Sequence, residues 1–465
     1  MTTRPRSIVV VGGGLSGLVA AYCIQRHAPE ISVKVLEASR APGGLIRTEC
    51  RDGYVIERAA DSILREPDDA LRLSTELGLK AEMINTNTSF RGAYVLREGQ
   101  LHRIPAEFRL LGPAQWWPFV VSPLLSLRGK LRACLEPWVP VRSDVSDESL
   151  EHFVVRRYGR ELFEYLAQPL VSGIYSVDPA KLSMHATLKR YCELEAKYGS
   201  VSRGLRKGKA RSSSNDAGVR YGLFFSYRLG LQTLIDALVD RLGSALSVNT
   251  EVTHLEPHLR GFRIQVKEGP SHLADAVLLA LPAGGAASLL KPWAPKVAAG
   301  FAEIKYSDAV VVTLAFELRQ IKHPLDAFGI VVPRVEQRPI SAVTFSSVKY
   351  GERAPDGKVL LRVYFNDFDA HDAGTRTDAE FVDEAQAELR PLLGVEGSPV
   401  FVQVSRIKEA IPGYTLGHTE RIARLREALG AYANLGVAGN YLTGVGIPHV
   451  IKNAEIEARR LIAPA

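Results

Sequence analysis

The stretch that most constrains this chain is an apolar run near the N-terminus that breaks at once into glycines. Residues 7–11 are Ser-Ile-Val-Val-Val, and Gly12, Gly14 and Gly17 follow at the spacing G-x-G-x-x-G. The first glycine allows a tight turn, the second lets the backbone approach a pyrophosphate, and the third lets a helix pack closely on its strand. The free N–H groups at the start of that helix then face the phosphates. For this motif alone, a glycine-rich surface turn is the alternative.

A carboxylate follows at the distance that a dinucleotide-binding fold requires. A second apolar run, residues 32–36, ends in Glu37, twenty residues past Gly17. A carboxylate at this place binds the ribose hydroxyls in dinucleotide folds. A solvated charge at a strand end is the alternative for Glu37 alone, but the glycines and Glu37 together predict dinucleotide binding.

The residues directly after Glu37 indicate which dinucleotide is bound. They contain a second glycine pair, Gly43-Gly44, between Arg40 and Arg47. A nicotinamide enzyme has no need of this pattern. It resembles the G-G-x-x-R-[ST] signature of the glutathione-reductase-like flavoproteins, especially the group of amine oxidases, protoporphyrinogen oxidases and phytoene desaturases. The resemblance implies FAD in a long cleft, with an arginine helping to hold the flavin end.

Composition bounds the class of protein. The 465 residues have room for about three domain-sized units, and 46% hydrophobic and 23% charged residues are ordinary for a globular enzyme. No stretch is apolar for long enough to span a bilayer, and the strand begins so early that we expect no signal peptide and a cytoplasmic location. The four cysteines are scattered without a C-x-x-C pair, which fits reduced thiols, and no metal site is expected.

The formal net charge of +7 is the second compositional feature. A basic surface attracts nucleic acid, anionic lipid or an acidic small molecule, or serves only solubility. Much of the excess lies in a Gly/Ser-rich segment, for which we expect a flexible loop over residues 203–220. We expect no nucleic-acid partner, because that role would rest on this loop alone.

Residues 106–200 differ from the rest of the chain in their helical periodicity, few expected strands and aromatic clusters. The segment 116–125, Trp-Trp-Pro-Phe-Val-Val-Ser-Pro-Leu-Leu, is too short to span a bilayer. It predicts either buried core, which we favour, or an amphipathic surface in a membrane interface. A peripheral contact with the inner face of the cell membrane therefore stays open. Residues 146–150 predict a helix start with capping residues.

The most family-specific stretch is residues 168–184, Gln-Pro-Leu-Val-Ser-Gly-Ile-Tyr-Ser-Val-Asp-Pro-Ala-Lys-Leu-Ser-Met. It resembles the segment S-G-[VIT]-x-[AS]-x-D-P-x-x-L-S-M of the protoporphyrinogen oxidases. Weaker resemblances to the same family follow in order at residues 198–201, 224–234, 345–357, 411–418 and 438–440. The chain departs from the related proteins at Ala59 and at Leu229, where they carry glycine. A further departure is noted at Ala60, where they carry proline or alanine.

The resemblance covers nearly the whole chain and implies a FAD-dependent oxidase that converts protoporphyrinogen IX to protoporphyrin IX in heme biosynthesis. It implies hydride abstraction by the flavin, O2 as the acceptor and an apolar cleft rimmed by arginines that bind substrate carboxylates. We assign no catalytic acid or base. His418 resembles part of a loop–helix start, so we expect a structural role rather than a general base.

Alternatives stay open at this stage. Coproporphyrinogen III is the alternative substrate within the family. A flavin amine oxidase is the nearest rival activity, but residues 309–312 lack the lysine and residues 436–450 the tryptophan that such enzymes typically carry. A carotenoid desaturase is a weaker rival. A flavin-binding protein without turnover is the alternative of another class, and a homodimer also stays open.

The resemblance implies two sets of site residues. The cofactor-binding set is Gly12, Gly14, Leu15, Ser16, Gly17, Glu37, Ala38, Arg40, Gly43, Gly44, Leu45, Arg47, Val252, Gly439, Asn440, Val445, Gly446 and Ile447. The candidate substrate-binding set is Arg91, Arg97, Gly173, Ile174, Ile330 and Tyr350. Arg91 and Arg97 enter this set because arginine can bind a carboxylate with two hydrogen bonds, but for each of them a solvated arginine in the β-hairpin expected over residues 91–105 is the better interpretation. Gly173, without a side chain, would let a macrocycle approach the flavin.

The expected fold is mixed α/β. A Rossmann-like FAD-binding domain of the glutathione-reductase type is expected from residues 1–88, 226–292 and 430–465. A mixed-sheet substrate domain is expected from residues 89–104 and 293–429, and a helical domain from residues 105–225.

Overall fold

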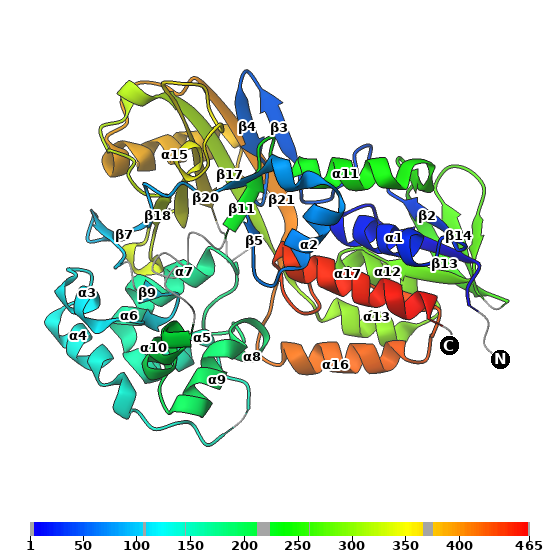
Figure 1. The fold of residues 1–465 in the computed structure, drawn as a ribbon, viewed down its shortest axis with the longest axis horizontal. Coiled ribbons are helices and arrows are strands. Elements are labelled where there is room, and N and C mark those ends of the chain that lie inside the picture. The colour runs from blue at the N-terminus through cyan, green and yellow to red at the C-terminus, as the bar shows by residue number, and fades with distance from the viewer. Residues whose placement is uncertain are drawn as a thin grey trace.

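The computed structural model describes residues 4–105, 108–144, 146–211, 224–259, 261–365 and 375–463. In Figure 1 these residues form three regions: helices around a parallel sheet at the right, a mixed sheet with α15 at the upper left, and a group of helices at the lower left. The mixed α/β fold predicted from the sequence is confirmed. The division into three domains stays a prediction.

The first region is built on a five-stranded parallel sheet. Its strands, in spatial order, are β12 (Leu246–Ser247), β2 (Ser32–Leu36), β1 (Ser7–Val11), β16 (Ala276–Leu279) and β22 (Leu435–Val437). Both faces are buried, which explains why β1 and β16 are continuous apolar runs. One face packs on α1 (Leu15–His27), α11 (Gln232–Leu242) and α17 (Ile447–Ile462).

The other face of the parallel sheet packs on a different set of elements. These are α12 (Ala283–Leu290), α13 (Pro295–Ala302), α16 (His418–Leu429), β13 (Val252–His258), β14 (Gly261–Val266) and β15 (His272–Ala274). Strands from residue 7 and from residue 435 lie in one sheet, so this region is built from both ends of the chain.

The second region is a seven-stranded sheet. Its strands, in spatial order, are β21 (Phe401–Pro412), β17 (Tyr306–Glu317), β20 (Lys358–Phe365), β19 (Ala342–Phe345), β18 (Gly329–Val331), β7 (Tyr94–Arg97) and β8 (Gln100–Arg103). All neighbours are antiparallel except β18 and β7. One face packs on α15 (Asp378–Leu393), whose start is a capping box of Thr377 and Glu380.

Smaller elements lie in the connections within and between these two regions. The strands are β3 (Thr48–Arg51), β4 (Tyr54–Glu57), β5 (Ile63–Leu64), β6 (Met83–Asn85) and β11 (Phe224–Tyr227). The helices are α2 (Asp69–Glu76), α14 (Ser346–Lys349) and the short 3-10 turns η1 (Leu79–Glu82), η4 (Gly243–Ala245), η5 (Leu318–Gln320) and η6 (Arg334–Glu336).

The third region is helical, as its periodicity predicts. Its elements are β9 (Phe108–Arg109), β10 (Gly112–Pro113), α3 (Trp116–Val121), α4 (Leu127–Cys134), η2 (Glu136–Trp138), α5 (Leu150–Tyr158), α6 (Arg160–Leu162), the π-turn η3 (Phe163–Ala167), α7 (Gln168–Ser172), α8 (Met184–Thr187), α9 (Lys189–Tyr198) and α10 (Val201–Arg211). The predicted helix start is confirmed, because the Ser149 hydroxyl accepts a hydrogen bond from His152 N.

The expected flexible loop over residues 203–220 is wrong in its first part. Residues 201–211 form α10, and residues 212–223 lie outside the described residues. The cause is the buried carboxylate of Glu136, which accepts hydrogen bonds from Ser200 Oγ at 2.6 Å and Val201 N at 2.8 Å. A negative charge at the first turn stabilises a helix, and local composition does not reveal a carboxylate that lies 64 positions earlier in the chain.

The segment 116–125 combines the two alternatives that the sequence left open. Phe119 and Leu124 are buried in the helical core, whereas the side of α3 that carries Trp117 faces solvent, with 76% of that residue exposed. None of the helices in the described ranges is long and apolar enough to cross a membrane.

Candidate cofactor and substrate site

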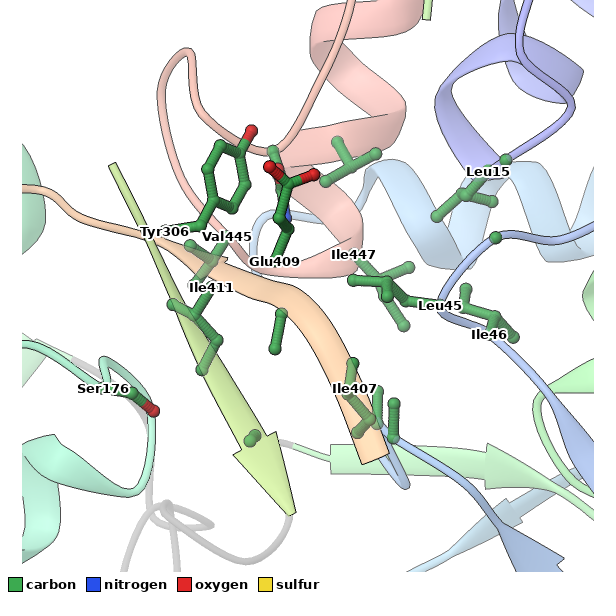
Figure 2. Close-up of a pocket in the computed structure, with 18 of the residues that line it drawn as sticks. Leu15, Leu45, Ile46, Ser176, Tyr306, Ile407, Glu409, Ile411, Val445 and Ile447 are labelled. Carbon is green, nitrogen blue, oxygen red and sulfur yellow. The ribbon is translucent and has the colours of Figure 1, made fainter. Parts of the chain in front are cut away.

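A cavity of about 1510 Å³ lies where the three regions meet. Figure 2 shows part of its lining, with Leu15 from the start of α1, Leu45 and Ile46 from the second glycine turn, Tyr306 from β17, Ile407, Glu409 and Ile411 from β21, and Val445 and Ile447 from the C-terminal turn. Most of the labelled side chains are apolar and surround a common space. One large apolar cavity with a few polar groups is the usual form of a site for a cofactor and a small molecule.

The first glycine turn lies at one end of this cavity. Gly12 has φ +104°, and a Cβ there would lie 2.5 Å from the carbonyl oxygen of Ala280. A Cβ on Gly17 would lie 1.9 Å from the carbonyl oxygen of Gly12, so α1 packs directly against the turn. Leu15 and Ser16, the first residues of α1, line the cavity. The turn therefore brings a helix N-terminus to the cavity, where an anion is stabilised.

Glu37 lies beside this turn at the end of β2. Its carboxylate accepts hydrogen bonds from Gly13 N at 2.6 Å and from Ser39 N at 2.8 Å. These bonds orient the side chain along the edge of the cavity, which Glu37 also lines. The geometry fits the ribose contact predicted from the sequence, and that role stays a prediction.

The second glycine turn is bonded to the first. Gly43 N donates to the carbonyl oxygen of Gly13 at 2.8 Å, and Gly43 and Gly44 both have positive φ. A Cβ on Gly44 would lie 3.2 Å from Gly14 Cα. The two turns therefore lie close together, and the close approach and positive φ favour glycine at Gly44, whereas a Cβ on Gly14 would make only an ordinary contact with Gly44 Cα at 3.8 Å.

The C-terminal turn after β22 forms a third part of the lining. Tyr414 fixes this turn, because its hydroxyl donates to the carbonyl oxygen of Asn440 at 2.6 Å and accepts from Gly444 N at 2.7 Å. His418 is buried, and its Nε2 lies 2.9 Å from the carbonyl oxygen of Tyr441. Burial lowers the pKa of His418 to about 4, and His418 does not line the cavity. Its geometry is that of a structural residue, as expected.

Most of the predicted cofactor residues meet at this cavity. Those that line it are Gly12, Gly14, Leu15, Ser16, Glu37, Ala38, Gly43, Gly44, Leu45, Val252, Gly439, Asn440, Val445 and Ile447. Gly17, Arg40, Arg47 and Gly446 do not line it. Gly17 supports the turn from behind, Arg40 is exposed, and Arg47 Nη2 donates to the carbonyl oxygen of Ala41 at 3.3 Å. The expectation of an arginine at the flavin end is thus not met by these two side chains.

The residues present fit FAD. The first glycine turn packs tightly on protein backbone at Gly12 and Gly17, a helix N-terminus reaches the cavity beside this turn, and the oriented carboxylate of Glu37 lines the same end of the cavity. The remaining apolar part of the cavity accommodates a flat ring system and a second molecule.

The predicted substrate residues divide into two groups. Gly173, Ile174 and Ile330 line the cavity. Arg91, Arg97 and Tyr350 do not, which corrects the expectation for them. Arg97 lies on the strand next to the helical region, where it pairs with Glu161 at 3.1 Å and donates to a carbonyl oxygen.

Arg91 and Tyr350 also lie outside the cavity lining. Arg91 is exposed to solvent. Tyr350 is buried beneath the cavity, where its hydroxyl donates to Ser62 Oγ at 2.9 Å.

Sequence reasoning missed the cations that do line the cavity. Arg109 from β9 and Arg190 from α9 lie on the side that the helical region provides, together with Tyr191 and Leu205. Lys349 and Lys408 line it from the mixed-sheet region. No motif marks these positions, because their place depends on how the helical region packs against the sheet.

A charged cluster lies in the lining close to the departures at Ala59 and Ala60. Lys349 Nζ lies 3.0 and 3.1 Å from the two carboxylate oxygens of Asp61, and Arg362 Nη1 lies 3.6 Å from Oδ2. Burial raises the pKa of Asp61, but the two cations outweigh burial and hold this pKa well below its usual range. Asp61 is therefore ionised at the cavity surface. Both alanines also line the cavity.

Comparison with known proteins gives consistent matches over the full length. The profile of the family described as flavin containing amine oxidoreductase matches residues 15–462. Coproporphyrinogen III oxidase of Bacillus subtilis is 32% identical over 459 residues, which are 97% of this chain and 97% of that protein. The chloroplastic protoporphyrinogen oxidase of Oryza sativa subsp. japonica is 30% identical over 480 residues, 97% of this chain and 87% of that protein.

A solved structure agrees over the same length. A crystal structure from Exiguobacterium sp. 255-15, assigned provisionally as a protoporphyrinogen oxidase, has a TM-score of 0.87 and 29% identity. The match covers 99% of this chain and 98% of that one.

Proposed function

Because this chain belongs to the flavin-containing amine oxidoreductases, and within them to the porphyrinogen oxidases, we propose that it oxidises a porphyrinogen to a porphyrin in heme biosynthesis, with O2 as the electron acceptor. The FAD expected from the glycine motifs is the cofactor of this family. Bound FAD supplies the hydride acceptor.

The observation that carries the proposal is one cavity with two kinds of lining. Its cofactor end has the glycine turns and Glu37, and its other end is apolar with arginines from the helical region. A porphyrinogen is a broad apolar macrocycle with carboxylate tails, so it needs apolar surface for the ring and cations for the tails. Gly173 leaves open space beside the ring, because a Cβ there would meet no atom closer than 3.9 Å.

The protein residues then bind, orient and desolvate the substrate. Ile174 and Ile330 exclude water from the ring, and Arg109 and Arg190 hold carboxylates. Ala309 and Val311 face the cavity from β17, so this strand presents no lysine of the kind that a flavin amine oxidase carries there. This lining supports a porphyrinogen over an amine as the substrate.

Protoporphyrinogen IX, predicted from the sequence, and coproporphyrinogen III are the two candidate substrates. They differ in the number of carboxylates, and each extra carboxylate favours an extra cation. Lys349 is paired with Asp61, and Arg109 and Arg190 line the cavity from the helical region. The two arginines, together with the 32% identity to the Bacillus subtilis coproporphyrinogen III oxidase, support coproporphyrinogen III as the alternative to protoporphyrinogen IX.

The test is an anaerobic mixture of the purified flavoprotein with each porphyrinogen in turn. We expect the flavin absorbance to bleach and porphyrin fluorescence to follow when air is admitted. Arg109→Ala with Arg190→Ala should raise KM at least about tenfold for the substrate whose carboxylates they bind. Arg91→Ala, an exposed arginine outside the cavity, is the matched control.

Two outcomes would contradict the proposal. A flavin that stays oxidised with both porphyrinogens while an amine bleaches it would favour amine oxidation. A flavin that no substrate bleaches would favour the alternative of a flavin-binding protein without turnover.

The cytoplasmic location, the peripheral membrane contact and the homodimer remain hypotheses. The membrane contact rests on the exposed Trp117 and on Arg128 and Lys130, which are the charged residues of segment 116–131. Co-sedimentation with anionic vesicles at low salt tests it, and sedimentation velocity without vesicles tests the homodimer.

A further inference from the structure

A row of polar side chains crosses the cavity-facing side of the seven-stranded sheet. Thr344 on β19 pairs with Arg362 on β20, Arg362 pairs with Thr313 on β17, and Thr313 pairs with Gln403 on β21. Directly opposite residues of antiparallel strands place their side chains on one face, so the four form a continuous line. The other face carries Val, Leu and Phe side chains that pack under α15.

The middle of this row is fully buried, and several of its polar atoms have no hydrogen-bond partner among the described residues, although Arg362 Nη2 donates to the carbonyl oxygen of Ala59. Thr313 and Arg362 are 0% and 1% exposed. Within the described part of the chain, Arg362 Nε and Nη1, Thr313 Oγ1 and Gln403 Oε1 have no hydrogen-bond partner. Ser405 Oγ and Tyr54 OH, which also are buried, share this property. Buried polar groups are nearly always hydrogen-bonded, and ordered water is the usual partner where protein provides none.

Both ends of the row reach places where water or protons can exchange. At one end, Arg362 Nη1 lies 3.6 Å from Asp61 Oδ2, and Asp61 and Thr344 line the cavity. At the other end, Gln403 lies half-buried on β21, the edge strand of the sheet. The row therefore connects the substrate cavity with the outer edge of the sheet.

We propose that ordered waters fill this row and carry protons between Asp61 at the cavity and solvent at Gln403. The proposal rests on the proposed porphyrinogen oxidation. Bound FAD would accept a hydride from a bridging carbon of the macrocycle in each two-electron step, and a pyrrole nitrogen would then lose a proton. The electron pair of the broken N–H bond forms the new double bond. The proton must leave an apolar cavity, and the ionised Asp61 orients the first water of the path out.

The hydration of the row has a test that needs no turnover. Thr313→Val keeps the shape of the side chain and removes its hydroxyl, whereas Thr313→Ser keeps the hydroxyl. In a hydrated row, valine leaves a water short of partners and lowers the melting temperature below that of the serine variant. In a dry row, valine removes an unsatisfied hydroxyl and raises the melting temperature. A high-resolution crystal structure should contain waters bonded to Thr313 Oγ1 and Arg362 Nε.

The relay itself is tested by the rate of anaerobic flavin reduction. We expect Thr313→Val and Gln403→Leu to slow reduction by at least about tenfold. We also expect a larger solvent deuterium isotope effect and an unchanged KM, because neither residue lines the cavity. Thr313→Ser should keep the wild-type rate and isotope effect.

The possible failures are distinguishable. An unchanged rate and isotope effect in Thr313→Val, with normal reduction of the wild type, would overturn the relay and leave the proposed function intact. A higher melting temperature of Thr313→Val and a row without ordered water would overturn the hydration. A wild-type flavin that stays oxidised with both porphyrinogens would overturn the proposed function and the relay with it.

Discussion

At the scale of single residues, Glu57 is a buried carboxyl group whose charge depends on pH near neutrality. Burial raises its pKa from 4.5 to about 7, although the Thr48 hydroxyl, which donates to it at 2.7 Å, and Arg353 favour the charged form. The folded protein therefore holds this proton more tightly than the unfolded chain. Stability from Glu57 is present below pH 4.5 and is lost as the pH rises to about 7.

We predict that Glu57→Gln removes this part of the pH dependence. The wild-type free energy of unfolding should lose about 3 kcal/mol from Glu57 across the pH window, and the glutamine variant should not. Thermal and urea unfolding between pH 4.5 and pH 7.5 measure the difference between the two proteins. If the free energy of unfolding changed with pH equally in the wild type and in Glu57→Gln, Glu57 would not be protonated in the folded state.

At the scale of elements, α10 exists because a distant ion pair supports its first turn. Glu136 and Arg157 have no exposed surface, and Arg157 Nε donates to Glu136 Oε1 at 3.0 Å. We predict that Glu136→Gln costs about 3–5 kcal/mol, because it leaves a buried guanidinium with too little negative charge and weakens the start of the helix. Urea unfolding measures the cost, and trypsin cleavage at Lys207 reports on α10.

The matched control is an exposed pair in the same region. Arg160 and Glu151 form an ion pair in which the Arg160 side chain is 56% exposed, so Arg160→Gln should cost less than about 1 kcal/mol. If Glu136→Gln were no less stable than this control, the capping of α10 by Glu136 would be refuted.

At the scale of the whole molecule, the cofactor site forms only when distant segments meet. Its lining includes the turn at residues 12–16, the turn at residues 43–45 and the C-terminal turn at residues 439–447. A ligand that binds only the folded state stabilises it, by about 2.7 kcal/mol at a hundredfold excess over Kd. We predict that flavin-free protein melts at a lower temperature and that added FAD restores the original value.

Riboflavin is the matched control ligand, because it lacks the pyrophosphate and ribose that the glycine turns and Glu37 are expected to hold. It should shift the melting temperature far less than FAD does. Equal shifts would mean that the glycine turns and Glu37 contribute little to cofactor binding.

The sequence by itself determined the elements whose signal is local. The β1–α1 turn was predictable because a Cβ on Gly12 or Gly17 would clash with backbone atoms. The turn therefore requires glycine at both positions, and their fixed spacing is visible in the sequence. The start of α5 was predictable for the same reason, since capping residues act over a few positions. The family followed from such short motifs in a constant order.

Only the tertiary structure decided which side chains share a surface. Arg97 and Arg109 are both arginines of short strands, yet Arg97 pairs with Glu161 and Arg109 lines the cavity. The capping of α10 by Glu136 and the polar row through Arg362 likewise join residues far apart in the chain. Local patterns determine backbone conformation over a few residues, whereas burial and electrostatic pairing depend on neighbours that come together only when the chain folds.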